Sequence, residues 1–150
     1  MYPRRRRIHL SDYDYSQPGY YFVTLCAEHR RPIFGTVQDG SVDLSPFGEI
    51  VQTPLDGLGA HYPGVSVDSS ITMPNHLHSI IVLEESNTLS LHEIMRRFKS
   101  FTVGEYRRHI DPAYRVEQGH VWQDRYHDIV IRNDRQLDAL RRYMANNPEQ

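Results

Sequence analysis

The sequence has only one cysteine, Cys26, among its 150 residues, so no disulfide can form within the chain. The lack of disulfides is typical of a reducing compartment, and we expect a cytoplasmic, nucleoid-associated protein. Long apolar runs are also missing, and no segment approaches the roughly 20 apolar residues that a membrane-spanning helix requires. A secretory signal is not expected, because the basic start of the chain is not followed by an apolar stretch.

An excess of charge of one sign is lacking as well, since the formal net charge is -2. This value argues against a protein that binds nucleic acid over its whole surface. The positive charges are instead gathered in two clusters, Arg4 to Arg7 and the group of Arg96, Arg97, Lys99, Arg107 and Arg108. Such clusters can hold phosphates on a nearly neutral chain. The alternative is a solvated tail and a solvated helix face, which the charges alone favour.

The order of the secondary-structure patterns predicts the fold class. Strands are expected at 20–26, 65–73, 76–83 and 128–132, where β-branched and aromatic residues gather. Helices are expected to begin after Ser45, after Ser90 and after Asn133 or Asp134, which are residues of the capping type. Asp39-Gly40 predicts a small hairpin, and Pro54 should kink or shorten the first helix.

Apart from the hairpin, this order is β-α-β-β-α-β followed by a helix. It is the split β-α-β pattern, and it predicts an α+β, ferredoxin-like domain with helices packed on an antiparallel sheet. The length fits one domain over residues 1–150, with residues 1–18 as a basic N-terminal segment. Many unrelated functions use this architecture, so the function must come from particular residues.

His76-Leu77-His78 at the start of a predicted strand is the first candidate site. Alternate residues of a strand point to the same face, with Cβ atoms about 7 Å apart, so the two imidazoles can converge on one metal ion. The alternative is a pair of hydrogen-bonded structural histidines, which is the commoner meaning of an isolated His-x-His.

Tyr143 and Asn147 on the last predicted helix form the second candidate site. They are four residues apart and therefore neighbours on one helix face. Both lie beside the apolar stripe of Leu137, Leu140 and Met144, at the margin of the packed face. The alternative is a tyrosine that flanks the core and an asparagine that ends a helix before proline.

The two candidate sites together suit phosphodiester chemistry. Displacement at phosphorus needs an electrophile that neutralises charge on the phosphate oxygens, and a nucleophile in line with the leaving oxygen. Two histidines and an asparagine carbonyl leave metal positions open for a phosphate, and Tyr143 can supply the attacking oxygen. Because an unperturbed tyrosine has a pKa of about 10, a metal ion or its bound water must help it to ionise.

Residues 73–83 (MPNHLHSIIVL) resemble the HUH motif of the single-tyrosine transposases, in particular the REP-associated tyrosine transposases. The resemblance extends over nearly the whole chain, in the order that the family shows. It includes residues 12–26 (DYDYSQPGYYFVTLC), 98–102 (FKSFT), 121–133 (VWQDRYHDIVIRN) and 143–148 (YMANNP).

The resemblance implies a role for each matching residue. His76, His78 and Asn147 match the metal ligands, and Tyr143 matches the nucleophile. The implied activity is magnesium- or manganese-dependent cleavage and transfer of single-stranded DNA near a hairpin, through a 5′-phosphotyrosine. The expected partner is single-stranded or hairpin DNA, with no membrane, and the protein is expected to be a monomer or a homodimer. Imidazole ligands favour manganese over magnesium.

Contacts with DNA are expected from basic and aromatic residues outside the metal site. The phosphate-contact candidates are Arg4, Arg5, Arg6, Arg7, Arg96, Arg97 and Lys99. Trp122 and Tyr126 are candidates for stacking on an unpaired base. A core or loop anchor is an equally good interpretation of Trp122.

Two other functions remain compatible with the sequence. One is a non-catalytic nucleic-acid-binding module, such as a domesticated transposase that acts as a regulator, with Tyr20 and Phe22 as stacking residues on the sheet. The other is a metal hydrolase in which His76 and His78 hold a metal that activates water.

Overall fold

The computed structural model describes residues 13–110 and 121–147. Along the chain the elements are β1 (Gly19–Cys26), η2 (Glu28–Arg30), β2 (Gly35–Gln38), β3 (Ser41–Leu44), α1 (Pro46–Asp56), α2 (Leu58–His61), β4 (Val65–Met73), β5 (His76–Leu83), α3 (Leu91–His109), β6 (His127–Ile131) and α4 (Asp134–Asn146). No helix within the described ranges is both long enough and apolar enough to cross a membrane.

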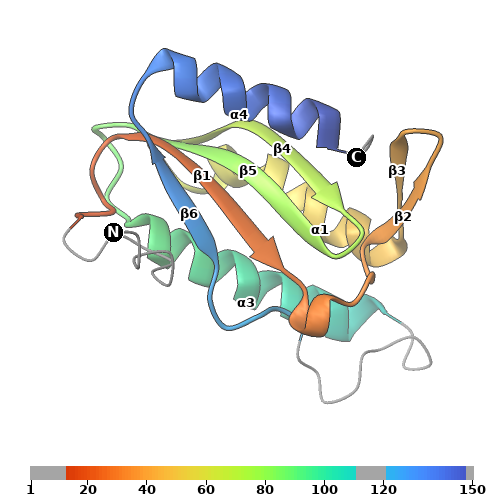
Figure 1. The fold of residues 1–150 in the computed structure, drawn as a ribbon. Helices are drawn as coiled ribbons and strands as arrows, with labels where there is room; N and C mark the ends of the chain where they lie inside the picture. Colours follow the sequence, from red (N-terminus) through yellow and green to blue (C-terminus); the bar gives the residue numbers. More distant parts are fainter. Residues whose placement is uncertain (1–12, 111–120, 148–150) are drawn as a thin grey trace.

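The main sheet has four strands in the order β4-β5-β1-β6 (Figure 1). Every neighbouring pair is antiparallel. The strands β1 and β4 are thus separated by β5, which is the order that a split β-α-β arrangement produces. The predicted α+β, ferredoxin-like architecture is confirmed.

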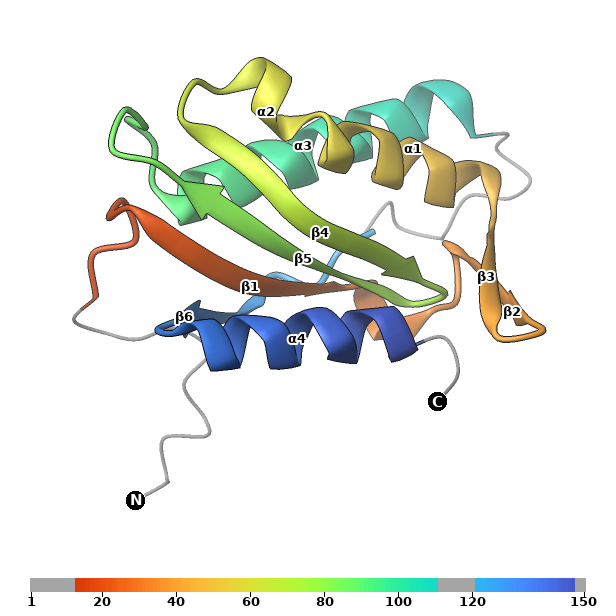
Figure 2. The same cartoon turned by 90° about the horizontal axis from the view of Figure 1, so that it is seen from above.

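Helices lie on both faces of the sheet (Figure 2). The helices α1 and α3 cover one face, where a large apolar cluster includes Tyr21, Leu25, Leu77, Ile81 and Ile94, all fully buried. The helix α4 packs on the opposite face. The buried cluster there is small, with Phe22 and Ile80 from the sheet and Leu137 and Met144 from the helix. Because strand residues alternate between faces, β1 and β5 contribute to both clusters.

The predicted helix starts are confirmed by their caps. The side chains of Ser45, Ser90 and Asn133 accept hydrogen bonds from backbone N–H groups of the first turns of α1, α3 and α4. These bonds satisfy donors that a helix N-terminus otherwise leaves without a partner. Helix α1 ends at Asp56, two residues after Pro54, as the shortening effect of proline predicts.

Two turns determine the course of the chain beside the main sheet. Asp39 and Gly40 have φ values of 52° and 76°, which are the left-handed conformations that a two-residue hairpin turn requires. They join β2 to β3 in the predicted hairpin. In β4, the register against β5 shifts between Val67 and Ser69. Asp68 is the extra residue of this bulge, and such a residue can be aimed differently from its neighbours.

Candidate active site

The two histidines of β5 lie side by side, with ring centroids 4.7 Å apart. Their neighbours on β1 are Cys26, which is opposite His76, and Thr24, which is opposite His78. The His78 ring stacks on Phe22, with centroids 5.0 Å apart. Phe22 belongs to the small apolar cluster under α4, called here the α4-side cluster. The pair therefore shares the face that α4 covers, as strand alternation predicts.

A hydrogen bond at Nδ1 orients each imidazole. Asn75 Oδ1 lies 2.7 Å from His76 Nδ1, and Thr24 Oγ1 lies 2.8 Å from His78 Nδ1. The asparagine oxygen can only accept, so His76 donates from Nδ1 and keeps a free lone pair on Nε2. The threonine hydroxyl can accept in the same way from His78. This is how outer partners orient histidines that bind a metal through Nε2.

Burial keeps both imidazoles uncharged at neutral pH. Burial, followed by the neighbouring charge of His76, lowers the pKa of His78 from 6.5 to about 4. The pKa of His76 is lowered by burial and then by the positive charge of Arg30. Only neutral imidazole binds a metal ion, so both side chains are in the competent form at physiological pH.

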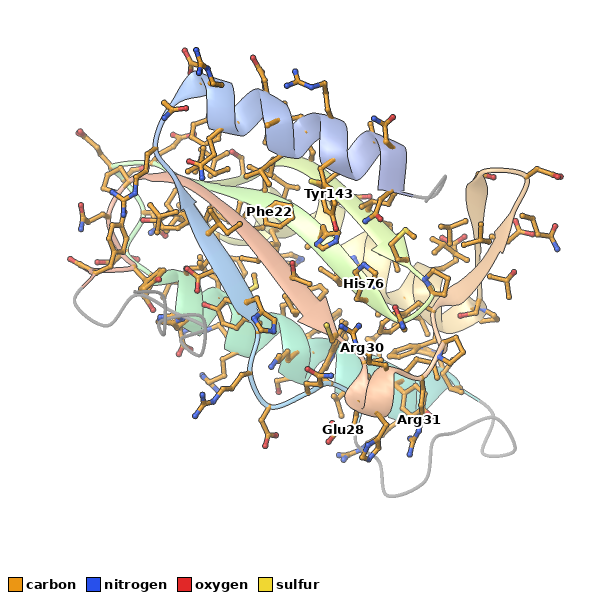
Figure 3. The ribbon with its side chains drawn as sticks, in the orientation of Figure 1. Phe22, Glu28, Arg30, Arg31, His76 and Tyr143 are labelled. Atoms are coloured by element: carbon orange, nitrogen blue, oxygen red, sulfur yellow. The ribbon has the colours of Figure 1, made fainter. Side chains whose placement is uncertain are left out.

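Tyr143 reaches the histidine pair from α4, in the same chain (Figure 3). Its ring centroid is 5.5 Å from that of His78 and 6.4 Å from that of Phe22, with edge-on geometry in both cases. The side chain is 43% exposed. The phenol is therefore held against an imidazole while solvent, or a substrate, can still approach it.

Asn147 follows one turn later and is the C-terminal cap of α4. Only 9% of it is exposed, and its amide nitrogen Nδ2 is buried without a hydrogen-bond partner. Nε2 of His78 is buried without a partner as well. Polar groups rarely stay unsatisfied in a protein interior, so each of these two groups is a candidate for binding a ligand.

These residues fit a divalent metal ion as a two-histidine site. In the part of the chain that the structure describes, no three His, Cys, Asp or Glu side chains gather as metal ligands. A third protein ligand therefore has to be of another type. Asn147 suits this role because rotation of its amide presents an oxygen in place of the nitrogen, and such oxygens bind Mg²⁺ and Mn²⁺.

An ion pair joins α4, which carries Tyr143, to strand β4. Arg141, two residues before the tyrosine, donates to both carboxylate oxygens of Asp68, at 2.6 and 3.0 Å. The guanidinium lowers the pKa of the Asp68 carboxyl. Asp68 is the bulged residue of β4, so the irregularity in the strand supplies the anchor of the tyrosine helix.

The predicted basic DNA contacts that the structure describes lie away from the histidines. Arg4 to Arg7 are outside the described residues. Arg96 and Arg97 are on α3, beyond the opposite face of the sheet, and both are paired with Glu93, at 2.6 and 2.7 Å. Lys99, also on α3, donates to the backbone oxygens of Gln123 and Asp124. The structure does not bring the three cations of α3 to Tyr143.

The two aromatic candidates are buried in the main core. Trp122 is 6% exposed and donates from its indole nitrogen to Thr102, at 2.9 Å. Tyr126 is 6% exposed and its hydroxyl is hydrogen-bonded to His92. The interpretation of Trp122 as a core anchor is confirmed, and burial leaves neither ring open for stacking on a base.

Four residues around the site were not predicted from the sequence: Thr24, Asp68, Asn75 and Arg141. The sequence could have indicated Asn75 as a partner of His76, because the two residues are adjacent at a tight turn. The others depend on the register of β1 against β5 and on the bulge in β4, which no local sequence pattern shows.

Comparison with known proteins gives matches along nearly the whole chain. The family model described as "Transposase IS200 like" matches residues 17–147. An uncharacterized protein of Haemophilus influenzae Rd is 27% identical over 164 residues, which span 96% of this chain and 88% of the relative.

Two solved structures share the fold. The REP-associated tyrosine transposase bound to a REP hairpin matches with a TM-score of 0.69 and 18% identity, over 94% of this chain and 72% of the other. A transposase candidate from Deinococcus radiodurans R1 matches with a TM-score of 0.57 and 10% identity, over 92% of this chain and 97% of the other. At these identities the likeness establishes the fold.

Proposed function

Since this chain belongs to the IS200-like transposase family, we propose that it cuts and rejoins single-stranded DNA through a covalent 5′-phosphotyrosine on Tyr143. We further propose that His76, His78 and Asn147 hold a Mg²⁺ or Mn²⁺ ion, and that the substrate is a hairpin of the REP type. The hairpin structure among the solved relatives supports this choice of substrate.

One observation carries the proposal. The phenol ring of Tyr143 is 5.5 Å from the ring of His78, and both His78 Nε2 and Asn147 Nδ2 are buried without a partner. The nucleophile and the two neutral imidazoles are thus neighbours in one chain, and Asn147 follows the tyrosine by one helical turn. A bound ligand would satisfy the two buried groups.

In the cleavage step, the hydroxyl oxygen of Tyr143 attacks the scissile phosphorus. A bond forms between that oxygen and phosphorus, and the bond from phosphorus to the 3′ oxygen breaks. The phenol proton goes to solvent, and the 3′ oxygen takes up a proton to become a free hydroxyl. The partial exposure of Tyr143 leaves room for the strand to reach its oxygen.

The joining step is the reverse reaction with another 3′-hydroxyl, which attacks the phosphotyrosine and releases the phenol. One phosphoester replaces another at each step, so no external energy source is needed. A divalent ion at the site would neutralise charge on the phosphate oxygens and promote ionisation of the phenol. His76 and His78 remain neutral and oriented by Asn75 and Thr24 during both steps.

A gel assay tests the proposal against the two other functions. A labelled hairpin with a single-stranded flank is incubated with the protein and Mn²⁺, or with a chelator. We expect cut DNA and a protein-linked 5′ product with Mn²⁺ only. Binding that survives chelation, with no cutting, would favour the non-catalytic module, and cutting without protein-linked DNA would favour the hydrolase.

The exposure of the sheet residues already argues against the module with a stacking platform. Phe22 is only 6% exposed because it packs between the site residues and the α4-side cluster. Tyr20 alone remains open, at 37%. A platform that stacks two bases needs two exposed rings.

A further inference from the structure

The turn that follows β1 lies against the histidine pair. It contains η2 and ends at Arg31. Figure 3 shows Arg30 next to His76. Two hydrogen bonds join this turn to the turn before β5: Ala27 N–H donates to Asn75 O at 2.9 Å, and the Asn75 side chain donates to Arg30 O at 3.5 Å. Asn75 also orients His76, so one residue links the turn to the proposed metal ligand.

The backbone of this turn is strained. His29 and Arg30 have φ values of 57° and 52°, in the left-handed region that residues other than glycine rarely adopt. Two such residues in succession persist only where the surrounding structure imposes them, and they concentrate at functional sites. The conformation determines where the Arg30 side chain begins, near His76 in Figure 3.

The two arginines of the turn have no ion-pair partner among the described residues. Arg30 is exposed, and Arg31 is half-buried with its Nη1 buried and without a hydrogen-bond partner. Arg97 and Arg141, in contrast, are each paired with a carboxylate. A buried guanidinium nitrogen without an acceptor is costly, and a phosphate oxygen is the acceptor that suits it best.

The charge of Arg30 also acts on the metal site itself. Figure 3 shows the Arg30 side chain near His76, so its positive charge disfavours a cation bound to the histidines. An anion between Arg30 and the histidine pair would remove this conflict, because it attracts both the guanidinium and the metal ion.

From this arrangement we propose that Arg30 and Arg31 each bind a backbone phosphate of the DNA strand that is being cut. The inference rests on the proposed function, since it names the part of the substrate that this turn holds. It also implies that DNA and metal bind cooperatively, with the phosphate compensating the repulsion between Arg30 and the ion. Contacts of this kind position a strand without reading its sequence.

The variants Arg30→Gln and Arg31→Gln test the site, with Arg135→Gln as the matched control. Arg135 is also exposed, but it lies in the first turn of α4, at the opposite helix end from Asn147. Binding of a fluorescein-labelled single strand of mixed sequence is measured by anisotropy in chelator, so that the strand stays intact. Arg31→Gln keeps the test decisive should Arg30→Gln fail to fold.

We expect each of the two variants to bind the strand about tenfold more weakly, as for the loss of one charged hydrogen bond. The slope of log affinity against log salt should fall by about 0.7 for one lost phosphate contact. Without DNA, Arg30→Gln should bind Mn²⁺ about threefold more tightly, because a nearby like charge is gone. Opposite effects on DNA and on metal are not expected from general damage to the fold.

Unchanged DNA binding by Arg30→Gln and Arg31→Gln, or an equal loss in Arg135→Gln, would overturn the site. This outcome is separable from failure of the proposed function. If the parent never forms protein-linked DNA but both variants lose binding and salt dependence, the phosphate site stands and the transfer chemistry falls. If the parent forms the adduct and the variants bind normally, the transfer chemistry stands and the phosphate site is refuted.

Discussion

The two faces of the sheet differ in what their side chains do. The face toward α1 and α3 carries the large apolar cluster, in which Tyr21, Leu25 and Ile81 are completely buried. The face toward α4 has a small apolar cluster and, beside it, the histidine pair with Tyr143. Apolar burial on the first face can stabilise the fold. The second face can therefore tolerate buried polar groups that lack some of their hydrogen bonds.

Strand β5 shows how closely the two roles are combined. Leu77 and Ile81 enter the large cluster, while the alternate residues His76 and His78 face α4. A strand places alternate residues on opposite faces, so one segment can serve stability and chemistry at once. Changes at neighbouring positions of β5 should therefore have different consequences, and the following predictions test this division.

The largest effect is expected for Tyr143→Phe, on the α4 face. Removing the hydroxyl removes the proposed nucleophile, so nicking of a hairpin with Mn²⁺ should fall by roughly 10⁴-fold or more. Thermal unfolding should stay nearly unchanged, because Tyr143 is partly exposed and the ring remains in the variant. Nicking at the rate of the parent would remove Tyr143 from the mechanism.

The next largest effect is expected for Ile81→Ala, on the face toward α1 and α3. Ile81 is fully buried, and truncation of such a side chain costs about 2–5 kcal/mol of unfolding free energy. Affinity for Mn²⁺ should be unchanged for the molecules that remain folded. The matched variant is Ile80→Ala, which lies in the small cluster under α4 and should disturb metal binding as well. Equal effects of both variants on metal binding would contradict the division of roles between the two faces of the sheet.

The pH dependence of His78 is the third prediction. Its titration, followed by NMR of the imidazole, should have a midpoint near 4, because burial among Phe22, His76 and Tyr143 disfavours the charged form. The unfolded chain takes up this proton first as the pH falls, near 6.5. The contribution of His78 to stability is therefore complete above pH 6.5 and is lost between 6.5 and about 4. A midpoint at 6.5 would show an open, hydrated site.

A smaller effect is expected for Thr24→Val. The substitution keeps the shape of the side chain but removes the hydroxyl that holds His78 Nδ1. Loss of such an outer partner weakens metal binding by about 10- to 100-fold. Calorimetric titration with Mn²⁺ measures the change, and Thr24→Ser, which keeps the hydroxyl, should retain most of the affinity. Tight binding by the valine variant would exclude the orienting role of Thr24.

The smallest effect is expected for Asp68→Asn, which removes one charge of the pair that fastens α4. Amide hydrogen exchange in α4 should become several-fold faster, whereas exchange in α3 should not change. Exposed ion pairs contribute little to global stability, so the thermal midpoint should hardly move. Equal acceleration in both helices would mean that the pair supports the whole fold.

Local sequence patterns were sufficient for the main strands and helices and for the positions of the candidate residues on them. The bounds of β4 and β5 agree with the prediction, and the capping residues of α1, α3 and α4 are those expected. The His76 and His78 pair followed from strand alternation, and Tyr143 and Asn147 from helical spacing. Each of these inferences depends on residues that are close in the chain.

The surroundings of the site required the tertiary structure. Thr24 meets His78 only through the pairing of β1 with β5, and Asp68 reaches Arg141 only because β4 bulges. Aromatic character alone did not show that Trp122 and Tyr126 are buried rather than exposed. Strand register, bulges and burial are properties of distant segments, so they leave no local signal.

Mass spectrometry of the protein-linked DNA tests the central claim most directly. After the hairpin is cut in the presence of Mn²⁺, the adduct is digested with protease and nuclease, and the modified peptide is sequenced. We expect a 5′-nucleotide on the phenol oxygen of Tyr143. A nucleotide on any other residue, such as the exposed Tyr20, or cut DNA with no modified peptide, would contradict it.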